Sequence, residues 1–209
     1  MADFKIEKAC LAQGHASVAG VDEVGRGSLF GPVVAVALVF PNRLFPRRPS
    51  WTKEIDDSKR LAATKRERLV REILAETQAL GVGTASNAEI DALNVFRATE
   101  LAMKRAVADL RLEPGIVLVD GLPLKDVDYP SMGVRGGDRK SVSIAAASIV
   151  AKVLRDGLMN LYDTIFGGYG LAAHKGYGTE EHYRAIGALG PTGLHRVSFD
   201  LKVERITKP

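Results

Sequence analysis

The stretch VAGVDEVGRGSLFGPVVAVALVF, residues 18–40, holds two runs of mostly β-branched and small apolar residues around a segment rich in glycine. β-branched residues favour strands, and glycine and proline between two such runs mark a turn. The sequence therefore predicts two strands joined by an unusual turn between Gly25 and Pro32. Asp22 and Glu23 stand inside the first strand, where an unpaired buried charge costs about 3 kcal/mol or more. Either an ion pair, with Arg26 or a lysine, or a divalent cation must compensate for them.

Two more acids stand in positions suited to a ligand site. Asp120 follows a run of four aliphatic residues that predicts a buried strand, and α/β folds commonly place ligand-binding groups where such strands end. A helix N-cap or a turn is the alternative for this residue. Asp138 follows two glycines, and taken alone it fits an Asx turn better. Neighbouring side chains of a regular strand face opposite sides, so the spacing of Asp22 and Glu23 does not prove that both bind one ion. The sequence has no CxxC or HExxH motif, and hard oxygen ligands favour Mg²⁺ or Mn²⁺ over Zn²⁺.

Three segments have the chemistry of a polyanion contact. In Gly25-Arg26-Gly27 the glycines allow backbone amides and a guanidinium to approach a ligand together, although a tight turn with a solvated arginine is the alternative. Residues 57–60, DSKR, are polar and basic just before a predicted helix, so they suit a phosphate or an ordinary exposed loop. Residues 174–179, HKGYGT, present Tyr177 beside a base and a hydroxyl, unless that ring only caps a small satellite core.

The rest of the chain predicts an α/β protein with a mixed sheet. An S/T-x-x-E capping box at Thr64 predicts a helix to about Leu80, and a second box at Ser86 starts a long helical region that ends before Pro114. Residues 116–119 form a short buried strand, and the Ala- and Ser-rich residues 141–161 form a closely packed helix. No repeat or linker divides the chain, so we expect one domain.

Composition limits the class of protein. The 209 residues are 46% hydrophobic and 26% charged, as in soluble globular proteins, and the net charge of +4 permits a polyanion partner without requiring one. The longest apolar run, residues 29–40, is too short to span a bilayer, and the first residues lack a signal-peptide pattern. We therefore expect a cytoplasmic protein without membrane segments. Cys10 is the single cysteine, which excludes an internal disulfide.

Taken together, these segments resemble the bacterial ribonuclease HII family, the type 2 ribonucleases H. DEVGRG followed by LFGPVV (residues 22–27 and 29–34) looks like the opening signature of the family, and DSK (57–59), VDG (119–121) and GD (137–138) look like its next motifs. The helix SIAAASIVAKV (143–153), closing with RD (155–156), and the segments HKGYGT (174–179) and HRVSF (195–199) complete the set. The resemblance covers about residues 18–199.

The resemblance implies a ribonuclease H-like five-stranded mixed sheet flanked by helices, with a helical C-terminal segment. It makes Asp22, Glu23, Asp120 and Asp138 the catalytic and metal-binding acids, with Asp156 in a structural role. It implies substrate contacts in which a glycine turn reads the ribose and basic or aromatic side chains meet the backbone, namely Gly25, Arg26, Gly27, Ser58, Lys59, Arg60, Lys175 and Tyr177. Ser28 replaces the usual proline of the family, which we expect to soften the turn, and Arg60 replaces a common lysine.

The resemblance also implies an endoribonuclease that hydrolyses the RNA strand of RNA/DNA hybrids and cuts 5′ of ribonucleotides embedded in duplex DNA. Two Mg²⁺ or Mn²⁺ ions would assist attack by water, which leaves 3′-hydroxyl and 5′-phosphate ends, in DNA replication and ribonucleotide excision repair. We expect a monomer; docking on a replication clamp and the choice of metal stay open. The alternatives are a type 3 ribonuclease H, which usually has an extra N-terminal domain and lacks the Gly-Arg-Gly turn, and a catalytically silent hybrid-binding module.

Overall fold

The two strands predicted from residues 18–40 form the centre of one sheet. The computed structural model describes residues 2–55 and 61–202. The strands, in chain order, are β1 (Val18–Val24), β2 (Val33–Val39), β3 (Ala79–Ala85), β4 (Ile116–Asp120) and β5 (Ser131–Val134). Their order in the sheet is β3-β2-β1-β4-β5, in which β2 pairs antiparallel with β1 and β3, while β4 pairs parallel with β1 and β5. This confirms the five-stranded mixed sheet.

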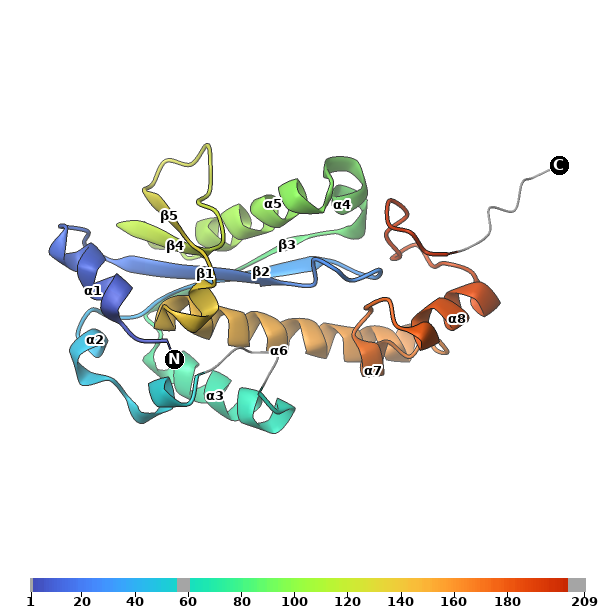
Figure 1. The fold of residues 1–209 in the computed structure, drawn as a ribbon, viewed down its shortest axis with the longest axis horizontal. Coiled ribbons are helices and arrows are strands. Elements are labelled where there is room, and N and C mark those ends of the chain that lie inside the picture. The colour runs from blue at the N-terminus through green and yellow to red at the C-terminus, as the bar shows by residue number, and fades with distance from the viewer. Residues whose placement is uncertain (1, 56–60, 203–209) are drawn as a thin grey trace.

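Helices cover both faces of the sheet (Figure 1). The longer helices are α3 (Ala63–Glu76), α5 (Val95–Ala108), α6 (Val142–Ile165) and α8 (Glu180–Leu189); the shorter ones are α1 (Lys5–Ala12), α2 (Leu44–Arg47), α4 (Asn87–Leu93) and α7 (Leu171–His174), with 3-10 turns η1 (Ser50–Lys53) and η2 (Gly137–Arg139). α5 packs on one face, and α6 with α3 packs on the other. α7 and α8 form the expected helical C-terminal segment beyond the end of β1.

The close packing predicted for the Ala- and Ser-rich helix is confirmed where α6 crosses β1. A Cβ atom on Gly20 would lie 2.3 Å from the carbonyl carbon of Ser143, so no larger residue fits this crossing. Ser141 caps the helix, because its hydroxyl accepts from the Ile144 amide at 3.2 Å. The crossing fixes the position of α6 against β1.

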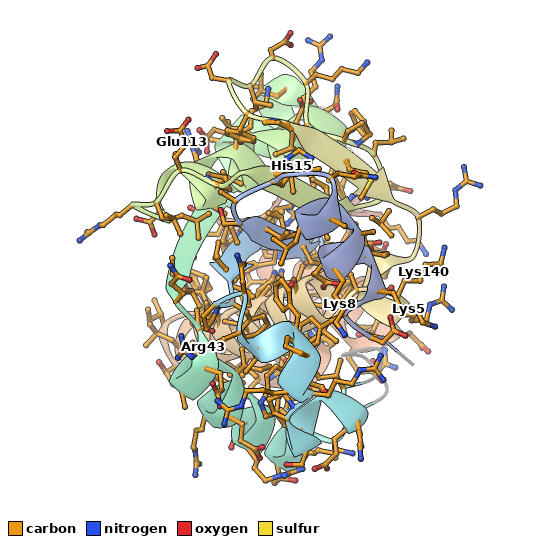
Figure 2. All side chains as sticks on the ribbon, turned by 90° about the vertical axis from the view of Figure 1, so that its left-hand side faces the viewer. Lys5, Lys8, His15, Arg43, Glu113 and Lys140 are labelled. Carbon is orange, nitrogen blue, oxygen red and sulfur yellow. The ribbon has the colours of Figure 1, made fainter. Side chains whose placement is uncertain are left out.

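The N-terminal helix α1 is tied to the start of α6 by a buried carboxylate. Glu7 accepts from the Ser141 hydroxyl at 2.7 Å and from the Ser143 amide at 2.9 Å. Figure 2 shows this end of the molecule, where Lys5 and Lys8 of the same helix are exposed. Cys10 is buried and free, as expected. Among the helices of the described residues, none is long and apolar enough to cross a membrane.

Three boundaries predicted from the sequence are wrong. α3 ends at Glu76 rather than near Leu80, because Leu80 pairs with Leu38 in the sheet, and pairing with β2 overrides helical spacing. The capping box at Thr64 does not form, since the helix begins after Ala62 without a side-chain cap. The box between Ser86 and Glu89 does form, but the helix it starts stops at Asn94. Asn94 has a φ of 70° and caps the following helix α5, so one predicted helical region is two helices.

Candidate active site

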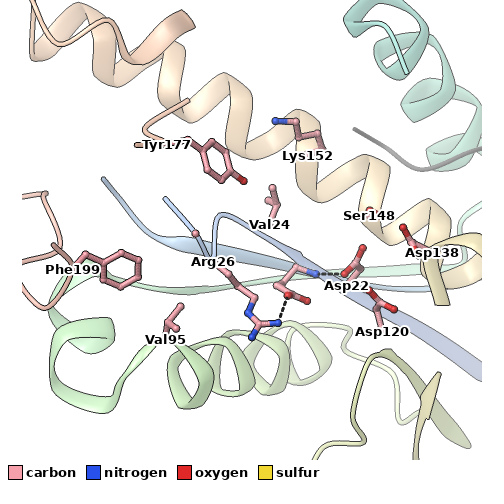
Figure 3. A pocket seen from close by; sticks show the side chains of 12 residues that line it. Asp22, Val24, Arg26, Val95, Asp120, Asp138, Ser148, Lys152, Tyr177 and Phe199 are labelled. Atoms are coloured by element: carbon pink, nitrogen blue, oxygen red, sulfur yellow. Dashed lines mark hydrogen bonds and ion pairs between the residues drawn. The ribbon is translucent and has the colours of Figure 1, made fainter. Parts of the chain in front are cut away.

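An open cavity of about 760 Å³ lies at the carboxyl ends of the parallel strands β1 and β4 (Figure 3). Parallel strands deliver the residues that follow them to one edge of a sheet, which is where α/β proteins bind ligands. The residues that line the cavity are Asp22, Glu23, Val24, Arg26, Gly27, Val95, Asp120, Asp138, Ser148, Lys152, Tyr177 and Phe199. The cavity therefore contains all four acids that the sequence singled out.

The most deeply buried of these acids is Asp22, which is 5% exposed. One of its carboxylate oxygens accepts from the Glu23 amide at 2.7 Å. Burial, followed by the negative charge of Glu23, raises the pKa of Asp22 well above its ordinary value; a hydrogen bond from Ser148 opposes this, and Asp120 adds to it. A bound cation would oppose this shift, because it favours the charged carboxylate.

Glu23 forms an ion pair with Arg26, one of the two ways expected to compensate for acids inside a strand. Its carboxylate lies 3.3 Å from the Arg26 guanidinium. Burial still raises the pKa of Glu23 although Arg26 lowers it, and Asp120 raises it further. Both Asp22 and Glu23 line the same cavity even though they are neighbours on a strand. The ion pair thus compensates Glu23 in part, and it leaves Asp22 without a cationic partner among the described side chains.

A hydrogen bond from the backbone of Gly137, the residue before Asp138, connects Asp120 to the Asp138 segment. Asp120 is the last residue of β4 and accepts from the Gly137 amide at 2.7 Å, a contact between segments 17 residues apart. Asp138, on η2, lies 3.8 Å from the Arg139 guanidinium. The bond to Gly137 holds the Asp138 segment against the end of β4, and Figure 3 shows Asp22, Asp120 and Asp138 at one side of the cavity.

The chemistry of these acids fits a hard divalent cation, because carboxylate oxygens are the preferred ligands of Mg²⁺ and Mn²⁺. Burial, followed by like charges, raises the pKa of Asp22, and a bound cation would offset the like charges. Within residues 2–55 and 61–202, however, no three acidic, histidine or cysteine side chains are gathered closely enough to hold an ion as they stand. The donor set fits, but these acids border an open cavity instead of enclosing a ready-made cage.

The Gly25-Arg26-Gly27 turn is held by hydrogen bonds from a buried arginine, Arg196. Arg196 donates to the carbonyl oxygens of Gly25 and Arg26, both at 2.8 Å, and to that of Gly31 at 2.9 and 3.0 Å. Gly25 also accepts from the Ser28 amide at 3.3 Å. In the described part of the chain, neither the Arg26 nor the Gly27 amide donates to a protein acceptor. Arg196 therefore occupies the carbonyl oxygens of Gly25 and Arg26, while the Arg26 and Gly27 N–H groups have no protein acceptor among the described residues.

Tyr177 stands opposite this turn. Its ring carbon Cε1 would lie 3.9 Å from a Cβ atom on Gly27, and its backbone forms a bridge with Ser28. Ser28 is buried and donates its hydroxyl to the Phe30 carbonyl oxygen at 3.0 Å. A proline at this position would lack the amide that bonds Gly25. The hydroxyl and the amide of Ser28 thus both hold the turn in place.

The structure does not bring every sequence-predicted residue to the cavity. Lys175 is not among the residues that line it, and its ammonium donates to Asn160. Ser58, Lys59 and Arg60 lie outside the described residues. Asp156 pairs with Lys152 at 2.7 Å and with Arg66 at 3.4 Å, which suits the structural role expected of it.

Five lining residues, one of which is Val24, were not singled out as site residues. Ser148 and Lys152 are four residues apart on α6 and therefore share one face of the helix, a spacing that was visible in the sequence. Val95 and Phe199 supply an apolar side of the cavity, beside Arg26 in Figure 3. Val95 begins α5 and Phe199 ends the HRVSF segment of the resemblance, but an apolar side chain gives no sign in the sequence that it faces a cavity rather than the core.

Comparison with known proteins gives a consistent result. The family model described as "Ribonuclease HII" matches residues 19–202. A curated protein named "Ribonuclease HII" from Geotalea daltonii is 49% identical over 187 residues, which cover 90% of this chain and 84% of that protein.

Solved structures share the fold. The ribonuclease H2 from Pyrococcus horikoshii OT3 superposes with a TM-score of 0.71 at 25% identity, covering 88% of this chain and 94% of that one. Bst-RNase HIII in complex with Mn2+ superposes with a TM-score of 0.68 at 22% identity, covering 92% and 70%. Because proteins of both types superpose, the fold does not separate them, whereas the sequence match does.

Proposed function

This chain belongs to the ribonuclease HII family and is an endoribonuclease H of type 2; on that premise we propose how its cavity selects and cuts its substrate. The substrates are RNA/DNA hybrids and duplex DNA with embedded ribonucleotides, cut on the 5′ side of the ribonucleotide. The products carry 3′-hydroxyl and 5′-phosphate ends. The type 3 enzyme and the silent hybrid-binding module are not favoured, because the family model and the relative at 49% identity are both ribonuclease HII.

One observation carries the proposal: the four carboxylates border the same cavity as Arg26 and Gly27 of the glycine turn. Asp22, Asp120 and Asp138 lie at one side, and Tyr177 lies at the other (Figure 3). A nucleotide that spans the cavity would place its sugar at the turn and its phosphate at the acids. Recognition and hydrolysis then act on one nucleotide.

Asp22, Glu23, Asp120 and Asp138 would hold the divalent cations, either Mg²⁺ or Mn²⁺. When bound, such ions supply activation of water and stabilisation of the charge that develops on phosphorus oxygens. The acids also keep the site negative without metal, so that a phosphate is repelled until cations are present. This accounts for why a nucleic-acid enzyme concentrates negative charge where its substrate binds.

The turn selects the ribose by donating hydrogen bonds. The Arg26 and Gly27 amides are the available donors, and a 2′-hydroxyl is an acceptor that deoxyribose lacks. A site built to bind a hydroxyl rejects the analogue without it by about 10⁴-fold. Arg26 itself is half exposed and pairs with Glu23, so its side chain links the turn to the acids.

The remaining substrate contacts are assigned by charge and position. Ser58, Lys59, Arg60 and Lys175 would contact phosphates along the duplex, and Lys152 would contact the phosphate nearest the acids because it lines the cavity. The chain would act in the cytoplasm as a monomer with one catalytic domain, residues 1–209, whose core is about residues 18–199.

The test is to offer the protein three duplexes: an RNA/DNA hybrid, a DNA duplex with one ribonucleotide, and the same duplex without it. Each is incubated with Mg²⁺, with Mn²⁺ or with chelator, and the cut ends are mapped. The proposal requires metal-dependent cuts 5′ of the ribonucleotide with 3′-hydroxyl ends. Cyclic phosphate ends, or equal cutting of the all-DNA duplex, would contradict it.

A further inference from the structure

Three of the four histidines of the chain are packed together beside the recognition turn. His174 stacks on His182 with ring centroids 4.3 Å apart, and His182 lies against His195 with centroids 5.3 Å apart. His182 and His195 are fully buried. The fourth, His15, is distant in the fold and bonds to the Gly115 carbonyl oxygen at 3.0 Å.

The partners of these rings fix where each proton lies. His182 Nδ1 is 3.0 Å from the carbonyl oxygen of Tyr177, which can only accept, so Nδ1 carries a proton. His195 Nδ1 lies 2.9 Å from the Thr192 amide, which can only donate, so this nitrogen has no proton. The bond of 3.2 Å between the two Nε2 atoms then runs from His195 to His182. Each partner thus requires a neutral ring in one tautomer.

The result is a directed chain of hydrogen bonds that ends on the backbone of Tyr177. It runs from the Thr192 amide through His195 and His182 to the Tyr177 carbonyl oxygen. The Tyr177 amide is held as well, because it donates to the His174 carbonyl oxygen at 3.0 Å. Both backbone polar groups of the aromatic residue that faces Gly27 are therefore fixed.

The same C-terminal segment holds the opposite side of the recognition site. His195 is followed by Arg196, whose amide donates to the Leu29 carbonyl oxygen at 2.9 Å and whose side chain holds the Gly25 and Arg26 carbonyl oxygens. Two adjacent residues thus connect to the two walls between which Gly27 and Tyr177 face each other. A change in one connection alters the gap between these walls.

We propose that His182 and His195 are positioning residues, which act as a neutral relay that sets the place of the Tyr177 ring over a bound ribonucleotide. The inference rests on the proposed role of Tyr177 in the recognition of that nucleotide. Burial, followed by the proximity of His182, lowers the pKa of His195 to about 4, and burial lowers the pKa of His182, which is consistent with neutral rings. If these histidines only filled space, apolar rings would serve equally well, and no particular tautomer would be needed.

The first test is spectroscopic and independent of activity. With ¹⁵N-labelled histidine, long-range ¹H–¹⁵N spectra at neutral pH report the protonated nitrogen of each of the four rings. We expect His182 to carry its proton on Nδ1 and His195 on Nε2. A doubly protonated ring, or the opposite tautomer at either residue, would overturn the relay.

The second test is a double-mutant cycle on the duplex with one ribonucleotide, with rates expressed per folded molecule. His182→Phe keeps a ring to stack on His174 but loses the side-chain donor to the Tyr177 carbonyl oxygen, which still accepts from the Thr179 amide at 2.8 Å, and it should lower the rate about tenfold. His182→Asn keeps a donor in the place of Nδ1 and should recover most of the rate. In a Tyr177→Ala background, His182→Phe should cost no more than about twofold. His15→Asn is the matched control and should leave the rate unchanged.

The outcomes separate the two hypotheses. If His182→Phe costs the same factor with and without the Tyr177 ring, or if His182→Asn loses as much as His182→Phe, the histidines only support packing and the relay inference is wrong. If Tyr177→Ala alone leaves the rate unchanged, the proposed role of Tyr177 fails, and the relay inference fails with it.

Discussion

The guanidinium of Arg196 donates to the carbonyl oxygen of Gly25 at 2.8 Å, and the arginine is fully buried. Its other acceptors are also backbone carbonyl oxygens, and no acidic side chain of the described residues forms an ion pair with it. Burial, followed by the charge of Arg155, lowers the pKa of Arg196 to about 9, so the side chain is still charged at neutral pH. A buried cation lowers stability unless all its N–H groups find acceptors. The acceptors of Arg196 include the carbonyl oxygens of the Gly25-Arg26-Gly27 turn, so we expect it to hold that turn in place.

Arg196→Lys should weaken both stability and ribose discrimination. An ammonium cannot reach the carbonyl oxygens of Gly25, Arg26 and Gly31 together, and each unmet buried acceptor costs about 1–3 kcal/mol. We expect unfolding to become easier by about 2–4 kcal/mol and the ratio of ribonucleotide to deoxyribonucleotide cutting to fall by about tenfold or more. Denaturant unfolding and rates per folded molecule measure the two effects.

Arg155→Lys is a useful comparison, although Arg155 also lies beside Gly25 and 5.7 Å from the centroid of the Tyr177 ring. Arg155 is equally buried and donates to the carbonyl oxygens of Phe30, Pro32 and Lys175, none of which belongs to the Gly25-Arg26-Gly27 turn. It should lose comparable stability with a smaller change in discrimination. Equal losses of discrimination in both variants would show that the Arg196 contacts have no special part in ribose selection.

The two glycines of the turn should respond differently to alanine. Gly25 has a φ of 94°, and a Cβ atom there would lie 2.1 Å from Arg155 Nε, so Gly25→Ala should destabilise the fold by about 2 kcal/mol or more. A Cβ atom on Gly27 meets only the Tyr177 ring, at 3.9 Å. Gly27→Ala should therefore keep the melting temperature but lower ribonucleotide cutting at least tenfold, because the methyl group fills the gap that the sugar needs. A fully active Gly27→Ala enzyme would contradict the location of the ribose.

The sequence predicted the parts of the site that interrupt a regular pattern. Acids inside the β1 run and after the β4 run are visible because they break an apolar stretch, and the structure brings Asp22 and Asp120 to one cavity. Arg196 and His182 were not identified, because an arginine or histidine in a loop or amphipathic helix is usually solvated, and only the fold shows that both are buried. The ends of α3 and α4 were missed for a related reason: sheet pairing and the cap at Asn94 override local helical spacing.

Removing one of the clustered acids should stabilise the metal-free protein. Burial and like charges raise the pKa of Asp22, so Asp22→Asn relieves a repulsion that is present without cations. We expect a higher melting temperature in chelator, a smaller increase on adding Mg²⁺ or Mn²⁺, and turnover reduced by about a hundredfold or more. Asp138→Asn should likewise nearly abolish turnover while the fold remains intact. Asp126→Asn makes the same charge change at an exposed site and should alter none of these; a wild-type response of Asp22→Asn to metal would refute its role as a ligand.

Stability should fall in mild acid because of the buried histidines. The pKa of His195 is about 4 in the folded protein against an ordinary 6.5, so between these values the unfolded chain binds a proton that the folded chain does not. Stability is unaffected by this group above about pH 6.5 and falls progressively as the pH falls toward 4, and the loss at pH 5 is about 2 kcal/mol. Denaturant unfolding at pH 8, 6.5 and 5 should show a flatter dependence in His195→Gln than in the wild type or in His15→Gln. Parallel curves for all three proteins would exclude a neutral buried His195.

The last prediction concerns how Tyr177 distinguishes substrates. Its ring lies across the gap from Gly27, within 5.7 Å of the Arg155 guanidinium carbon, so it has a fixed place at one wall of the cavity. Stacking of an aromatic ring on a nucleotide contributes about 1–3 kcal/mol. Tyr177→Ala should therefore slow cutting at a single embedded ribonucleotide by about tenfold to a hundredfold, and Tyr177→Phe should cost less because it keeps the ring.

Long RNA/DNA hybrids should be less sensitive to the same change, because they offer the enzyme many registers in which other contacts compensate. The quantity to compare is the ratio of the two rates, on the one-ribonucleotide duplex and on the hybrid, for wild type, Tyr177→Phe and Tyr177→Ala. Salt must be held constant, since phosphate contacts weaken steeply as its concentration rises. If Tyr177→Ala lowers stability but leaves this ratio and both rates per folded molecule unchanged, the ring serves packing alone, and recognition must reside in the Gly25-Arg26-Gly27 turn.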